Sequence, residues 1–248
     1  MKMRIGIFLK KYILLIFILN INFSYGQFRS KNLENYDKKP INFGFSLGFN
    51  TMDFNVQLSK NLLLNKFDSS SKVPRDVIYS INVEKQTGIN INIVSNLRIF
   101  EFLDLRFMPG IELGQRNLIY KIYDGEIFRE HIMEIESIFM EVPLLLKFKA
   151  MRDGNYSPYL IAGINYRIDW ASKKKIREEE KPKIRLNRND YYFEFGVGID
   201  YYLPFFKLST EIKLSVGQNN MVNFDNTPHS DALDFLHSRI WVFAFHFE

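Results

Sequence analysis

Residues 190–217 alternate in character at every second position, and this alternation restricts the possible folds more than any other feature of the chain. From Tyr191 to Leu203 the odd-numbered residues are apolar or aromatic, while the residues between them are Tyr, Glu, Gly or Asp. A period of two is typical of β-strands, whose successive side chains point to opposite faces. A second alternating stretch follows Pro204, so the segment predicts two strands joined by a tight turn.

The same alternation recurs along the chain and predicts an all-β protein with eight strands. Each predicted strand has one apolar face and one face of polar, charged or small residues. An even number of antiparallel strands is typical of closed outer-membrane barrels. The strands are predicted at about 41–54, 87–99, 102–120, 133–150, 155–172, 190–203, 206–217 and 238–247.

A membrane barrel explains why charged residues oppose the apolar faces. In such a barrel the apolar face contacts lipid and the polar face lines the interior. The alternative is a soluble lipocalin-like barrel, which would turn its apolar residues inward around a ligand. The predicted connections favour the membrane barrel, because short turns near 100–102, 152–154 and 203–205 alternate with longer connections at 55–86, 121–132, 173–189 and 218–237.

The N-terminal residues resemble a secretory signal peptide. Lys2, Arg4, Lys10 and Lys11 precede an apolar run at 12–19 and small residues before Gln27, which predicts cleavage at that point. We therefore expect a signal peptide at 1–26, an N-terminal periplasmic segment at 27–40 and the barrel at 41–248. The four leader cations reduce the formal net charge from +5 to +1 after cleavage, so a nucleic-acid partner is not expected.

The inward faces of these strands predict a charged but balanced interior. An eight-stranded barrel is only wide enough for side chains to fill it, and buried charges must be paired. We therefore predict a closed interior held by ion pairs rather than a conducting pore. The predicted network contains Arg98, Asp104, Arg106, Glu112, Arg116, Glu141, Lys147, Arg167, Asp169, Glu194, Asp200, Lys207, Glu211 and Lys213.

A basic loop follows the fifth predicted strand. Clustered Lys and Arg residues attract phosphate groups, so the loop is a candidate contact for lipopolysaccharide or an acidic partner. The alternative is a solvated loop whose charges repel one another. The candidate residues are Lys173, Lys174, Lys175, Arg177, Lys181, Lys183, Arg185 and Arg188.

Six short segments, taken in chain order, match one known family: 43–45, 49–54, 105–110, 114–118, 141–145 and 163–166. With these segments the chain resembles the PorT family of outer-membrane β-barrel proteins of Bacteroidetes. This resemblance implies a non-enzymatic accessory component, or scaffold, of type IX protein secretion and gliding motility. It also implies secretion-system subunits as partners, besides the lipids and lipopolysaccharide of the outer membrane.

Two other functional classes stay open. One is a generic small outer-membrane barrel, either porin-like or an adhesin. The other is a membrane-embedded hydrolase, because His229, Ser230 and Asp231 are the residue types of a nucleophilic catalytic triad. Three consecutive loop residues do not establish the geometry of a catalytic triad, so we do not expect an enzyme. The sequence predicts no cofactor and no metal site.

Overall fold

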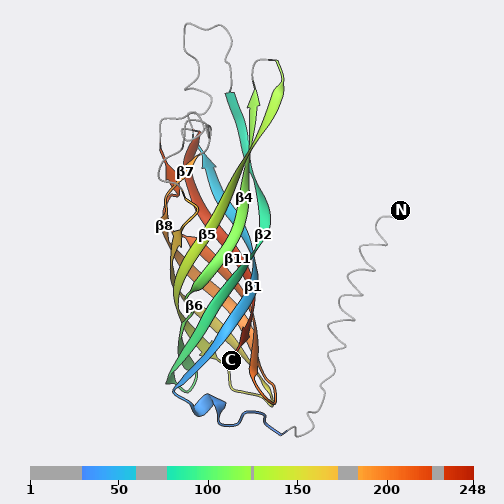
Figure 1. The fold of residues 1–248 in the computed structure, drawn as a ribbon, viewed down its shortest axis with the longest axis vertical. Helices are drawn as coiled ribbons and strands as arrows, with labels where there is room; N and C mark the ends of the chain where they lie inside the picture. The colour runs from blue at the N-terminus through green and yellow to red at the C-terminus, as the bar shows by residue number, and fades with distance from the viewer. Residues whose placement is uncertain (1–29, 60–76, 124–125, 173–183, 225–231) are drawn as a thin grey trace, which may run out of the picture. The chain divides into compact units, whose positions relative to one another are not determined.

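The computed structural model describes residues 30–59, 77–123, 126–172, 184–224 and 232–248. Residues Lys31–Glu248 form one compact unit, built almost entirely from antiparallel strands (Figure 1). The predicted signal peptide lies outside the described residues. Among the described residues, no helix has the length and apolar character needed to cross a membrane.

The barrel wall is a single sheet, and two very short strands pair beside it. A 3-10 helix, η1 (Tyr36–Lys38), precedes the first strand. The strands of the wall are β1 (Ile41–Leu58), β2 (Val77–Phe100), β3 (Leu103–Phe107), β4 (Gly110–Tyr123), β5 (Phe128–Lys149), β6 (Tyr156–Asp169), β8 (Asn189–Tyr202), β9 (Lys207–Gly217) and β11 (Leu233–Phe247); the short pair is β7 (Arg185–Leu186) and β10 (Val222–Asn223).

The wall closes because β1 pairs with β2 on one side and with β11 on the other. β3 and β4 together make one barrel strand, since both lie between β2 and β5. Met108 and Pro109 separate them, so the single strand predicted at 102–120 is interrupted where proline has no N–H for the ladder. The carbonyl of Pro109 still accepts a hydrogen bond from Ile93 N at 3.0 Å. The predicted fold, an eight-stranded antiparallel barrel, is confirmed.

Several strands are longer than predicted at the end that carries the long connections. β2 begins at Val77 instead of near residue 87, and β1 continues to Leu58. β4 and β5 remain paired as far as Tyr123 and Phe128, so most of the connection predicted at 121–132 is a β-hairpin. Figure 1 shows β2, β4 and β5 rising beyond the rest of the wall. The predicted short turns at the opposite end are present, and we call that end the inner mouth.

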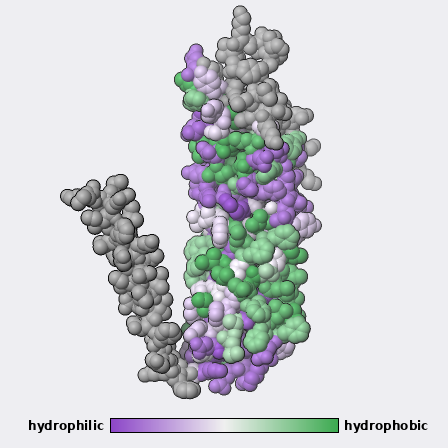
Figure 2. All heavy atoms as spheres, turned by 180° about the vertical axis from the view of Figure 1, so that it is seen from behind, coloured by the Kyte–Doolittle hydropathy of each residue, from purple (hydrophilic) through white to green (hydrophobic). Residues whose placement is uncertain are grey.

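An apolar band surrounds the barrel, as the sequence predicts. On β5 the outward apolar residues run from Ile138 to Phe148, and on β8 from Tyr191 to Tyr201. Each run covers about 11 positions, which is the length of a tilted strand that crosses a bilayer. Figure 2 shows this hydrophobic band between hydrophilic belts. The alternative of a soluble barrel with these residues inside is therefore wrong.

The two faces of the wall exchange character beyond the apolar band. On β1 the outward residues are apolar up to Phe49, and the inward residues are polar or glycine up to Asn50. After this point the outward positions become polar and the inward positions become apolar. The outward residues are then Thr51, Asp53, Asn55 and Gln57, and the inward residues are Met52, Phe54, Val56 and Leu58.

This exchange creates a second, conventional hydrophobic core outside the membrane. We call this part the outer extension; it comprises 53–58, 77–86, 115–123, 128–137 and 232–239, together with 184–186 and 221–223, which contain β7 and β10. Apolar side chains meet inside it and most of its outward residues are polar, as in a soluble protein, although Tyr79, Phe128 and Ile132 are exposed. Its buried core contains Phe54, Ile78, Ile81, Leu118, Tyr120, Met133, Ile184, Leu186, Met221, Val222, Ala232, Leu233 and Leu236.

Candidate functional site

The barrel interior contains the charged residues that the sequence places there. Arg98 is the exception: it lies at the inner mouth and is partly exposed, because its strand ends there. The other predicted members have at most 4% of their surface exposed. These are Asp104, Arg106, Glu112, Arg116, Glu141, Lys147, Arg167, Asp169, Glu194, Asp200, Lys207, Glu211 and Lys213.

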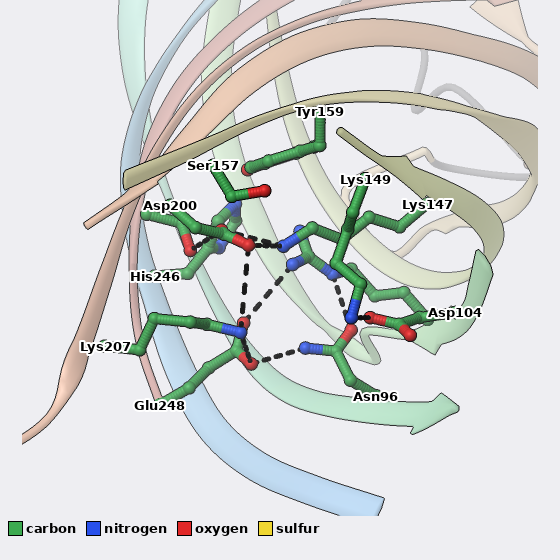
Figure 3. A network of polar contacts seen from close by, with 12 residues as sticks. Asn96, Asp104, Lys147, Lys149, Ser157, Tyr159, Asp200, Lys207, His246 and Glu248 are labelled. Atoms are coloured by element: carbon green, nitrogen blue, oxygen red, sulfur yellow. Dashed lines mark hydrogen bonds and ion pairs between the residues drawn. The ribbon is translucent and has the colours of Figure 1, made fainter. Parts of the chain in front are cut away.

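The network nearest the inner mouth includes Asp200, Lys207 and Glu248, which Figure 3 shows close together, and Arg106 also belongs to it. The Arg106 guanidinium group lies 2.9 Å from a carboxylate oxygen of Glu211 and 3.2 Å from one of Glu248. Lys207 pairs with Glu248 at 2.8 Å. Lys147 pairs with Asp200 at 2.7 Å. Four strands and the C-terminal Glu248 therefore contribute charges near the inner mouth, and each cation is paired with a carboxylate.

A second network occupies the middle of the barrel. Arg167 Nη2 lies 3.1 Å from a carboxylate oxygen of each of three residues: Glu112, Glu141 and Glu194. Lys213 pairs with Glu194 at 2.8 Å. These charges come from β4, β5, β6, β8 and β9, so Arg167 links most of the circumference through one guanidinium group.

Arg116 marks the border between the polar interior and the outer core. It donates hydrogen bonds to Ser238 Oγ at 2.6 Å and to Ser137 Oγ at 2.9 Å. Its guanidinium carbon also lies 3.9 Å from the centre of the Phe54 ring. A cation over an aromatic face is stabilised by the ring quadrupole. This residue therefore joins the polar interior to the apolar core above it.

Neutral residues complete the network, and the sequence prediction did not include them. Asn165 Nδ2 donates to Glu141 and to Glu194, each at 2.9 Å. Tyr159 donates to Glu211 at 2.9 Å. A side chain at Gly198 would collide with the Tyr159 ring, at 2.3 Å from its Cβ, so this glycine makes room for the tyrosine. Inward position on a strand is the signal that identifies such residues.

The inner mouth is covered by residues 32–39, which we call the cap. The Tyr36 hydroxyl donates to Glu248 at 3.1 Å, and Asp37 accepts a hydrogen bond from Tyr202 at 2.8 Å. Burial, followed by the Glu248 carboxylate, raises the pKa of Tyr36 above its ordinary value, so its hydroxyl remains a donor even at a pH where a free tyrosine ionises. From the barrel side, Arg152 donates a hydrogen bond to the Asn32 carbonyl. The predicted periplasmic segment thus ends in a structured cover.

The predicted basic loop lies mostly outside the described residues. Lys173, Lys174, Lys175, Arg177, Lys181 and Lys183 all fall there. Arg185 belongs to β7 and is partly buried, whereas Arg188 is exposed. His229, Ser230 and Asp231 also fall outside the described part. Among the described residues, no group of His, Cys, Asp or Glu is arranged to hold a metal ion.

The fold and the lipid-facing band define an integral outer-membrane β-barrel. The sequence profile of the outer membrane protein beta-barrel domain family matches residues 17–223, and the chain belongs to this family. The protein is located in the outer membrane. No curated protein matches the sequence.

Solved structures of small outer-membrane proteins are similar to this chain. OprG from Pseudomonas aeruginosa has 13% identity and a TM-score of 0.44, with 83% of this chain and 92% of OprG covered. Neisserial surface protein A has 10% identity and a TM-score of 0.41, covering 84% and 99%. Ail from Yersinia pestis, in complex with a heparin analogue, has 11% identity and a TM-score of 0.37, covering 83% and 96%.

Proposed function

We propose that this protein is a non-enzymatic, non-conducting outer-membrane barrel that acts through the surfaces at its two ends. The packed interior is the observation that carries this proposal. Arg106, Arg116 and Arg167 are fully buried there beside large aromatic side chains, and ion pairs bridge the wall in successive layers. This arrangement favours a binding barrel, such as an adhesin, over a porin-like barrel.

The outer extension supports this proposal, because a barrel needs only its membrane-spanning part to be inserted. Here the wall continues beyond the apolar band and builds a separate hydrophobic core. Part of the outer extension, formed by β2, β4 and β5, rises beyond the rest of the wall (Figure 1), and we call it the projecting sheet. It exposes Tyr79, Phe128 and Ile132. Tyr79 and Phe128 contact each other edge to face, with ring centres 5.7 Å apart. Exposed apolar clusters of this kind are typical of interaction surfaces.

An accessory role in type IX secretion is the second candidate. It is supported by the sequence segments that resemble the PorT family, in particular 105–110 and 114–118. Those segments form β3, β4 and the interruption between them. In this role the same end surfaces would contact secretion subunits instead of an external ligand.

Two measurements test the proposal. Purified protein in planar bilayers should give no stepwise single-channel currents, and regular open-channel steps would contradict the filled interior. A deletion strain should then be assayed both for export of secreted proteins and for surface binding. Loss of export favours the accessory role, whereas loss of binding with normal export favours the adhesin-like role. Complementation with a Tyr79→Ser/Phe128→Ser variant should fail if the projecting sheet carries the function.

A further inference from the structure

The cap is held to the barrel by a small number of polar contacts. Asn32, Leu33, Tyr36 and Asp37 are partly buried, whereas the other cap residues are exposed. The helix η1 has no buried residue. A segment that contributes nothing to an apolar core gains little from burial, so its attachment depends on recognition by the mouth.

The mouth surrounds one residue of the cap, Asp37, with hydrogen-bond donors and cations. Tyr202 donates to Asp37 Oδ1 at 2.8 Å, and Lys149 Nζ lies 3.8 Å from the same oxygen. Arg152 Nη1 lies 3.8 Å from Oδ2, and Arg98 donates to the Asp37 carbonyl. Three cations and a hydroxyl thus converge on a single residue of the cap.

The neighbouring residue of the cap occupies an aromatic subsite. The Tyr36 ring packs edge to face on Tyr202, with centres 6.2 Å apart. Lys207 Nζ lies 4.6 Å from the centre of the Tyr36 ring, and the Tyr36 hydroxyl reaches Glu248. An aromatic ring followed directly by a carboxylate therefore matches the mouth in both shape and charge.

The barrel also forms hydrogen bonds with the backbone of the cap. Arg152 donates to the Asn32 carbonyl, while Asn155 accepts from Asn32 N at 2.8 Å. Leu33 adopts a positive φ of 51°, a conformation that costs a non-glycine residue energy. The contacts with Asn32 hold the adjoining backbone in this conformation at the mouth.

We infer that the inner mouth is a peptide-binding site for an aromatic residue followed by a carboxylate, and that residues 32–37 occupy it in cis. The matching occupant in trans is a segment of a periplasmic protein that adopts the same turn conformation and carries the same chemistry, and it would displace the cap. This inference refines the proposed function at one end of the barrel, and its test measures peptide binding alone, so its outcome is separate from the conductance and export assays.

The test uses a fluorescent synthetic peptide of residues 30–40 and the complete chain in detergent micelles. The wild-type chain should bind it weakly, because the tethered cap competes at an effective concentration on the order of mM. A Tyr36→Ala/Asp37→Asn chain should bind it at least about tenfold more tightly, and a peptide carrying Asp37→Asn should lose at least about tenfold in affinity.

Two matched variants locate the binding site. Adding Tyr202→Phe to the loosened chain keeps the ring but removes the hydroxyl donor, and it should weaken peptide binding. Lys38→Gln changes an exposed cap residue whose side chain contacts Asn35, and it should behave as wild type. Equal binding by the wild-type and loosened chains, or no binding by a loosened chain that keeps its barrel fold, would overturn the inference.

A second measurement covers the case in which the loosened chain does not fold. The chain has no cysteine, so Lys38→Cys provides a single position for a nitroxide label on an otherwise wild-type protein. Excess unlabelled peptide should displace the cap and increase the mobility of the label. An unchanged spectrum at saturating peptide would show that the cap is a fixed part of the barrel.

Discussion

Replacing Arg167 by methionine should severely destabilise the barrel. The guanidinium group contacts three carboxylates at 3.1 Å each, and at an effective dielectric constant of about 20 each contact is worth roughly 5 kcal/mol of attraction. Repulsion among the carboxylates and the cost of desolvation offset much of this. Since breaking a buried ion pair typically costs about 3–5 kcal/mol, we expect a loss of that size in the free energy of unfolding.

The measurement is urea unfolding of the refolded chain in lipid vesicles, followed by tryptophan fluorescence. Arg167→Met/Glu112→Gln/Glu141→Gln retains the Lys213–Glu194 pair and removes the uncompensated charges, so it should recover most of the loss. Lys121→Met is the control, because Lys121 pairs with Glu130 at the surface at 3.2 Å and should cost at most about 1 kcal/mol. A tolerated Arg167→Met, or a triple variant less stable than the single, would refute the reasoning.

Three further predictions concern the two faces of the wall and the outer core. Phe195→Lys places a charge in the lipid-facing band and should cost about 2–4 kcal/mol in the same unfolding assay, whereas Gln57→Lys on the outer extension should be nearly neutral. Leu118→Ala opens a cavity in the outer core and should cost about 2–5 kcal/mol, with faster amide hydrogen exchange in the outer extension; uniform changes along the barrel would argue against a separate core. Ile119→Ala, on the opposite face of the same strand, should cost less than Leu118→Ala.

The sequence predicted the membrane-spanning part of the fold well, because one physical pattern controls it. Lipid on one side and a narrow interior on the other force each strand to alternate, and β8 shows this from Tyr191 to Tyr201. The outer extension was missed because its alternation is inverted. At Phe54 and Leu118, which lie within the strands predicted at 41–54 and 102–120, the apolar residues have moved to the inward face. Beyond them outward apolar residues no longer mark the strands, so 55–58, 77–86, 121–123 and 128–132 were predicted as connections.

The candidate site was predictable in composition but not in connectivity. Strand parity placed Arg106, Arg167 and Glu194 inside the barrel, and they are buried there. Parity does not say which carboxylate meets which cation, because that depends on strand register and stagger. The cap could not be found in this way, since Tyr36 and Asp37 precede the first strand and carry no alternating pattern.

The exchange of faces along one strand is the central claim, and site-directed spin labelling of β5 tests it most directly. Single nitroxide labels at Val142 and Leu144 should be accessible to oxygen in lipid vesicles, while labels at Glu134 and Glu136 should be accessible to a water-soluble nickel reagent. A label at Leu145, which points inward and is fully buried, should be accessible to neither. Nickel access at Val142 and Leu144, or oxygen preference at Glu134 and Glu136, would contradict the account.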